Sequence, residues 1–290
     1  MGYQNSFGTR GTVRTDGNVN FTAVEDLGGG MKVTAVGGID LAHRGQLAAG
    51  RNLSLSLATA DVGTFSMASV NANNSSRLGD AGGTISLDKN IDDIYGADVN
   101  IQSFGYTAPT FVKGLTLAVG WSGAAGAQLA GNTTDDVTAN QANPGKITKA
   151  SADYSAKYEF DGGNVVLTYR PDDKRARYGV NYSLAGLNFG AHVVPEYTNA
   201  ATSRVGTQTE FEVWMPVGAL TVGAQYGTRA AYTAVASTGN TNYLKQTGTA
   251  FGLKYAFSKR TSIIASFAKI DDGTSDANTT QQRIKLNHTF

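Results

Sequence analysis

The sequence contains no cysteine, which excludes disulfide bonds, thiol nucleophiles and cysteine-ligated metal sites. It also has no run of about 18 apolar residues, so a bundle of membrane-spanning helices is excluded. Charged residues make up only 16% of the chain and nearly cancel, with a formal net charge of +1. We therefore expect no basic surface for nucleic acid.

Groups that commonly carry catalysis are also scarce. The three histidines, His43, His192 and His288, lie far apart in the sequence. None belongs to an HExxH metal motif or to a GxSxG nucleophile turn. We expect no enzyme, no cofactor and no bound metal. The residues after Met1 do not form a basic segment followed by an apolar one, so no signal peptide is expected either.

What the sequence has instead is 36 glycines, 13 tyrosines and a two-residue alternation that recurs along the chain. In the segment SADYSAKYEF, the even positions from Tyr154 to Phe160 are apolar and the odd positions from Asp153 to Glu159 are polar. This period is typical of a β-strand with one apolar and one polar face. The same pattern recurs at 164–170, 177–184, 209–215, 220–226, 250–257 and 283–290.

The length of these segments separates two kinds of all-β protein. They run for about 8 to 11 residues, which a tilted strand needs to cross a bilayer, whereas ordinary strands average about 5 or 6. Their polar sides are rich in Gly, Ser, Thr and Asn, as expected for a water-filled lumen. Tyr106, Tyr169, Tyr197 and Phe257 stand near segment ends, where we expect aromatic girdles. We predict a transmembrane antiparallel β-barrel; a soluble β-sandwich and a secreted β-solenoid are the alternatives.

The connections between these segments alternate in length. Short links containing Gly or Asp occur at DLGGG, DVG, DGGN and LAGL, and long polar stretches occur at 122–149, 195–208, 228–248 and 271–281. Membrane barrels join their strands by short periplasmic turns and longer external loops. We therefore predict that EDLGGG, residues 25–30, is a periplasmic hairpin turn in which the glycines adopt positive φ.

Three segments resemble one family. EDLGGGMK, at 25–32, resembles the EDLGGGLK turn of Gram-negative general porins, especially those of β-proteobacteria. YTAPTFVKGL, at 106–115, is similar to the family's YxSPxFxGF segment, and the chain ends on an aromatic residue, Phe290. The resemblance implies one barrel domain over 1–290, located in the outer membrane and assembled as a homotrimer. It also implies passive diffusion of small hydrophilic solutes and ions, with membrane lipid and lipopolysaccharide around the barrel. A substrate-specific porin for a sugar, phosphate or small organic anion is the alternative.

The strand number follows from the pattern and from a parity rule. From Asn18 onward we count about fifteen strands, and bacterial single-chain barrels have an even number. We predict sixteen, with the additional strand between Gln4 and Thr15. Fourteen is the alternative, if a shorter segment such as GTFSMASV, at 63–70, is not a strand.

The resemblance also suggests a pore constriction. The segment Asn71–Ala97 stands where the family's third loop bends into the lumen, and a solvated external loop is the alternative. Its acidic candidates are Asp80, Asp88, Asp92 and Asp93. Basic candidates for the pore wall are Arg10, Arg14, Lys32, Arg44, Arg51 and Arg77. Opposed charges across a narrow pore set up a transverse field that sorts ions by sign.

Further charges are expected to face the lumen from the alternation alone. The basic ones are Lys157, Arg170, Arg177, Arg229, Lys254, Arg283 and Lys285, and the acidic ones are Asp153, Glu159, Glu210 and Glu212. The basic surplus favours anions and the loop aspartates favour cations, so the sign of the selectivity stays open.

Overall fold

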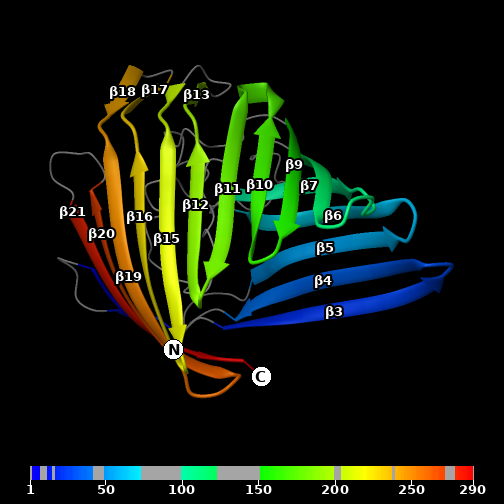
Figure 1. Ribbon diagram of the computed structural model, residues 1–290, viewed down its shortest axis with the longest axis horizontal. Helices are drawn as coiled ribbons and strands as arrows, with labels where there is room; N and C mark the ends of the chain where they lie inside the picture. Colours follow the sequence, from blue (N-terminus) through cyan, green and yellow to red (C-terminus); the bar gives the residue numbers. More distant parts are fainter. Residues whose placement is uncertain are drawn as a thin grey trace.

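One large antiparallel sheet dominates the computed structural model, which describes residues 2–6, 12–14, 17–41, 49–72, 99–122, 151–198, 204–236, 239–271 and 278–289 (Figure 1). The large sheet has 17 strands: β1 (Gly2–Ser6), β2 (Thr12–Arg14), β3 (Gly17–Gly28), β4 (Met31–Leu41), β5 (Ala49–Thr59), β6 (Gly63–Ala72), β7 (Val99–Thr107), β8 (Leu115–Ser122), β9 (Ser151–Phe160), β10 (Gly163–Arg170), β11 (Arg175–Leu184), β12 (Leu187–Val194), β15 (Gln208–Val217), β16 (Leu220–Arg229), β19 (Gln246–Ala256), β20 (Thr261–Asp271) and β21 (Asn278–His288). A smaller sheet contains β13 (Tyr197–Thr198), β14 (Arg204–Val205), β17 (Tyr232–Ala236) and β18 (Gly239–Tyr243).

Helical structure is minor in these ranges. A 3-10 helix, η2 (Pro171–Asp173), joins β10 to β11. Among the described residues, no helix has the length and apolar character needed to cross a membrane.

The strands of the large sheet pair with their neighbours along the chain, and the two ends of the chain meet. β1 pairs with β21, with Gly2 opposite Lys285, and β2 pairs with β1. Within the described ranges no pairing joins β2 to β3, so the wall has a seam there. Figure 1 shows how far the sheet curves, since β3, β4 and β5 run across the direction of β15 and β16. The arrangement is that of a β-barrel wall.

The strand count agrees with the sequence from Gly17 onward, where the large sheet has the fifteen strands expected. The segment that gave rise to the fourteen-strand alternative is β6 and is a full strand. The difference lies before Gly17, because the single strand expected between Gln4 and Thr15 is the short pair β1 and β2. Within the described residues the large sheet therefore has seventeen strands, where sixteen were predicted.

The two faces of the sheet confirm the alternation and exclude the sandwich. On β15, Phe211 is 53% exposed, whereas Glu210 and Glu212 on either side are 0% and 8% exposed. The large apolar side chains thus lie on the accessible face and the polar ones on the crowded face, as expected for the convex and concave sides of a curled sheet. We call these the outer face and the inner face. A soluble sandwich would bury its apolar face instead.

The turn that joins β3 to β4 is as predicted. Gly28, Gly29 and Gly30 all have positive φ, of 76°, 59° and 77°. Asp26 Oδ1 accepts a hydrogen bond of 2.8 Å from the backbone N–H of Gly28, which fixes the start of the turn. Such backbone angles suit glycine because it has no Cβ to clash. The other short links, between β5 and β6, β9 and β10, and β11 and β12, are also tight turns.

A second turn glycine is predicted to be essential for folding. Gly63 has a φ of +101°, and a Cβ built there would lie 2.3 Å from the carbonyl oxygen of Thr107. We expect Gly63→Ala to destabilise the barrel by roughly 2 kcal/mol or more, because both the backbone angle and the contact are unfavourable. Thermal unfolding followed by circular dichroism measures the effect. Gly29→Ala is the control, since its Cβ would meet nothing within 4 Å; equal losses would show that the Thr107 contact is unimportant.

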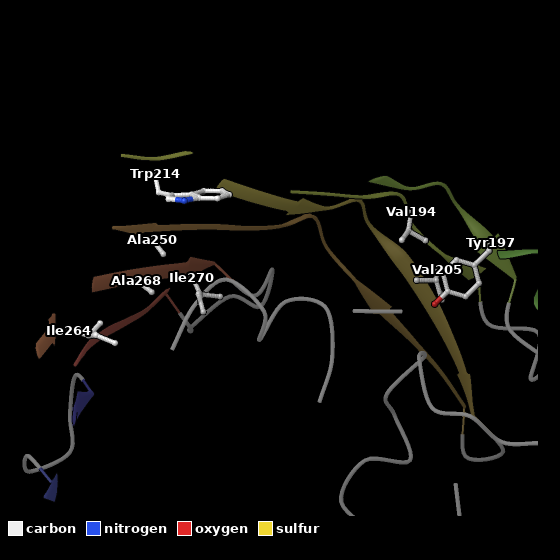
Figure 2. Packing of buried hydrophobic residues seen from close by; sticks show 8 residues of the cluster. All are labelled: Val194, Tyr197, Val205, Trp214, Ala250, Ile264, Ala268 and Ile270. Atoms are coloured by element: carbon white, nitrogen blue, oxygen red, sulfur yellow. The ribbon is translucent and has the colours of Figure 1, made fainter. Parts of the chain in front are cut away.

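The smaller sheet was not predicted from the sequence. It forms from two of the long stretches, 195–208 and 228–248, and Figure 1 shows β13, β17 and β18 above the ends of the main strands. Figure 2 shows Val194, Tyr197 and Val205 packed there, and Trp214 near Ala250 in the second part of the same apolar cluster. Tyr197 is only 4% exposed, so its expected place in an aromatic girdle was wrong.

The other three aromatic residues predicted to lie in the girdles are exposed or partly exposed. Phe257 is 60% and Tyr169 is 41% exposed. Tyr106 packs its ring 5.0 Å from that of Phe65 and donates a hydrogen bond to the carbonyl oxygen of Val62. They stand at the ends of β19, β10 and β7, where a membrane barrel carries its girdles.

Candidate functional site

The inner face of β9 to β19 carries most of the buried polar side chains in the described part of the chain. Strand register places them in rows across the wall. One row contains Gly179, His192 and Glu210, which are paired across β11, β12 and β15. Polar groups are costly to bury without partners, so their contacts define the site.

His192 and Arg177 form the centre of this site. An Nη2 atom of Arg177 lies 2.9 Å from Nδ1 of His192. Because arginine can only donate, Nδ1 is the acceptor in this contact. Glu210, 0% exposed, lies near enough to Arg177 to interact with its charge, and Arg175 is a second positive neighbour.

A glycine makes room for this contact. A Cβ built at Gly179 would lie 2.7 Å from the imidazole ring of His192, so the ring lies directly over the glycine of the neighbouring strand. Any other residue at 179 would push the ring out of position. The contact between Arg177 and His192, on adjacent strands, therefore depends on Gly179, which has no side chain to displace the imidazole ring.

Two further pairs extend the polar network along the wall. Arg170 binds Asp153 through two hydrogen bonds, with 2.8 Å between Arg170 Nε and Asp153 Oδ1. The planar guanidinium matches a carboxylate in this arrangement. One row below Glu210, the Gln225 amide donates a hydrogen bond of 2.9 Å to Glu212.

The network ends beneath the smaller sheet. The guanidinium of Arg175 lies 5.2 Å from the ring centre of Tyr197, and that of Arg229 lies 4.7 Å from that of Tyr232. Such cation–π contacts stabilise a buried cation. Both arginines are nearly inaccessible, at 4% and 3% exposed. They join the wall to the small sheet above it.

Most residues proposed for the constriction from the sequence lie outside the described part of the chain. These are Asp80, Asp88, Asp92, Asp93, Arg10, Arg44 and Arg77. The proposed loop itself begins later than expected, because Asn71 and Ala72 still belong to β6. Its remaining residues lie outside the described ranges.

The other basic candidates, Arg14, Lys32 and Arg51, lie on three different strands, and the described part of the chain shows no contact between them. Arg14 is in β2 and Arg51 is in β5, and the structure describes only their backbone. Lys32 pairs with Asp26 and with Ala58, so it stands beside the Gly28–Gly30 turn, at the rim of the wall, and it is exposed. A position at the rim does not suit a constriction at mid-height.

Sequence reasoning found part of the inner-face network and missed the rest. Asp153, Arg170, Arg177, Arg229, Glu210 and Glu212 were expected to face inward, and they do. His192 was considered only as a catalytic group, and Arg175 was not considered. Residues two apart on a strand lie on the same face. This spacing was a usable signal, since Arg175 is two residues from Arg177 and His192 is two residues from Gly190. Which partner each would meet depends on strand register.

Comparisons with known proteins agree with this architecture. The sequence profile of the Gram-negative porin family matches residues 1–275. Among solved structures, Salmonella typhi OmpF in complex with daunomycin superposes with a TM-score of 0.69 at 13% identity, covering 100% of this chain and 95% of the other. A loop-deletion mutant of OmpT, an outer membrane protein of Vibrio cholerae, gives 0.65 at 14% identity, with 99% and 95% covered. A mutant of Rhodopseudomonas blastica porin gives 0.63 at 15% identity, with 100% and 96% covered.

These structural similarities concern the fold, because the identities are low. No curated protein matches the sequence significantly.

Proposed function

The chain belongs to the Gram-negative porin family, and from this premise we propose that the inner face of the wall surrounds a water-filled path and that the buried charges of the inner-face network sort solutes through their electrostatic field. The family places the protein in the bacterial outer membrane as a general diffusion channel. What remains to be assigned is which residues act on a passing solute, and how the chain assembles.

One observation carries this proposal: the apolar side chains are exposed and the polar ones are buried, which is the reverse of the distribution in a soluble protein. Phe251, on the outer face of β19, is 54% exposed, whereas Gln246 on its inner face is 7% exposed. An apolar outer face suits contact with lipid, and a polar inner face suits a water-filled lumen. A barrel of about sixteen strands is wide enough to leave an aqueous channel.

The charges within the network nearly balance. The inner face presents four arginines and three carboxylates in the network: Arg170, Arg175, Arg177 and Arg229 against Asp153, Glu210 and Glu212. Each arginine is engaged, with Asp153, Tyr197, His192 and Tyr232 respectively. An arginine series dedicated to phosphate would need uncommitted guanidinium groups. This favours a general channel over a phosphate-specific one.

We further propose that the loop of residues 73–97 supplies the acidic side of a constriction. Its candidates remain Asp80, Asp88, Asp92 and Asp93, facing basic residues of the wall. With positive and negative groups on opposite sides, a transverse field would orient polar solutes as they pass. The proposal rests on the family's third loop and on the local acidic excess of the sequence.

The assembly is proposed to be a homotrimer surrounded by outer-membrane lipid and lipopolysaccharide. Purified from membranes, or refolded in detergent, the protein should have the mass of three chains by light scattering. It should also insert into planar bilayers in steps of constant conductance. A monomer without channel activity would contradict both the assembly and the open lumen. The reversal potential in a salt gradient, recorded in the same experiment, gives the ion preference.

A further inference from the structure

An apolar groove crosses the outer face of the barrel between β11 and β19. Its volume is about 460 Å³. Aromatic side chains form its walls, among them Phe189, Phe211, Tyr226 and Phe251, which are 40% to 54% exposed. Small residues, Ala191 and Ala224, form its floor. The groove is a hollow in a face that is otherwise covered by large side chains.

Strand register explains the hollow. Ala191 is paired with Phe211, and Ala224 is paired with Phe251, so each alanine has an aromatic neighbour on the adjacent strand. Side chains that share one face of a sheet stand side by side across the strands. A short side chain between taller ones leaves a depression. Two such positions on β12 and β16 give the groove its length.

The groove has a polar end. Thr249 is part of its lining and is paired with Lys269 on β20. Lys269 is exposed. Asp271, one row further toward the end of β20, already interacts within the chain. An exposed ammonium group thus stands beside the apolar groove.

The polar end of the groove lies at the level along the barrel where we expect the membrane interface. Thr209 and Thr228 occupy the next row on the same face, and their hydroxyl groups lie 2.8 Å apart. Below them the outer face is apolar, and above them stand the long connections and the smaller sheet. The change from apolar to hydroxyl-bearing residues marks the level where hydrocarbon gives way to headgroups.

We propose that this groove binds a lipid of the outer leaflet with a net negative phosphate headgroup, with an acyl chain along the aromatic walls and the anionic headgroup at Lys269. An engineered cavity of about 150 Å³ holds the six carbons of benzene. A groove of about 460 Å³ therefore has room for a chain of roughly eighteen carbons. The lysine gives such a lipid its headgroup partner. The inference rests on the outer-membrane placement and not on the proposed charge sorting in the lumen.

The test counts lipids retained by the detergent-purified channel in native mass spectrometry, with phosphatidylglycerol and phosphatidylcholine as probes. The wild type should retain the anionic lipid about fivefold better, the effect expected for one lysine near an anionic lipid headgroup. Lys269→Gln should remove that preference and leave binding of both lipids at the lower level. Ala224→Phe, which fills the groove, should reduce the retention of both lipids about tenfold. Ala191→Phe tests the same point should the first variant not assemble.

Matched controls lie outside the groove and outside the lumen. Lys259→Gln removes an exposed lysine from the turn between β19 and β20, and Ala265→Phe adds a phenyl ring to the outer face outside the groove. Both should behave as the wild type, and all variants should keep its conductance, which separates this inference from the channel function. Equal retention of the two lipids by the wild type would overturn the proposal. So would unchanged retention in both groove-filling variants, or their conversion to monomers without loss of lipid, which would indicate a contact between copies.

Discussion

Replacing Asp88, Asp92 and Asp93 together by asparagine is expected to shift the zero-current potential of the channel toward anions. If the proposed loop narrows the pore, these carboxylates act on a passing ion where water is scarce and screening is weak. We expect a shift on the order of 10 mV in a tenfold salt gradient, for which a perfectly selective pore gives about 59 mV. Conductance should change little, since asparagine nearly preserves the volume of aspartate. Recordings from single channels in planar bilayers give both quantities.

The control for this experiment is a second acidic pair in a different loop. Asp135 and Asp136 belong to the long stretch at 122–149, which we interpret as external. At physiological salt the Debye length is about 8 Å, so distant external charges should be screened. Their replacement by asparagine should leave the potential unchanged. Equal shifts from the two sets, or none from the first, would place the constriction elsewhere.

Replacing Glu210 by glutamine is expected to destabilise the whole barrel. Glu210 is 0% exposed and its charge interacts with that of Arg177, while Arg175 adds a second positive charge. Removing one partner from a buried charge cluster costs about 3 kcal/mol or more. For a chain of this size the apparent unfolding temperature should fall by roughly 6 to 12 °C. Circular dichroism of the detergent-solubilised protein measures it.

A double variant separates lost charge balance from lost packing. If the cost of Glu210→Gln is the uncompensated charge of Arg177, then adding Arg177→Gln should restore part of the stability. Glu159→Gln is the matched control, because Glu159 is 61% exposed in its 2.6 Å pair with Lys157. An exposed pair contributes only about 0 to 1 kcal/mol. A similar loss in the control, or simple addition in the double variant, would mean that the buried cluster has no special electrostatic role.

The sequence alone determined the features that depend on neighbouring residues. The alternation at 151–160 requires one apolar and one polar face, whatever the rest of the chain does, and β9 has those faces. The three glycines at 28–30 allow the backbone angles of a tight turn, and the turn is there. Such local patterns were sufficient for the all-β class, for fifteen of the strands and for the membrane-barrel interpretation.

Tertiary structure decided every feature that depends on which strands meet. The sequence places Arg177, His192 and Glu210 on inward positions, but only register brings them into one cluster, over the gap left by Gly179. Tyr197 is likewise buried in a cluster with Val194 and Val205, and Arg175 of another strand lies over its ring. The smaller sheet joins segments that are far apart along the chain. Pairing between distant strands has no local signature, because its free energy comes from contacts that exist only once both strands are in place.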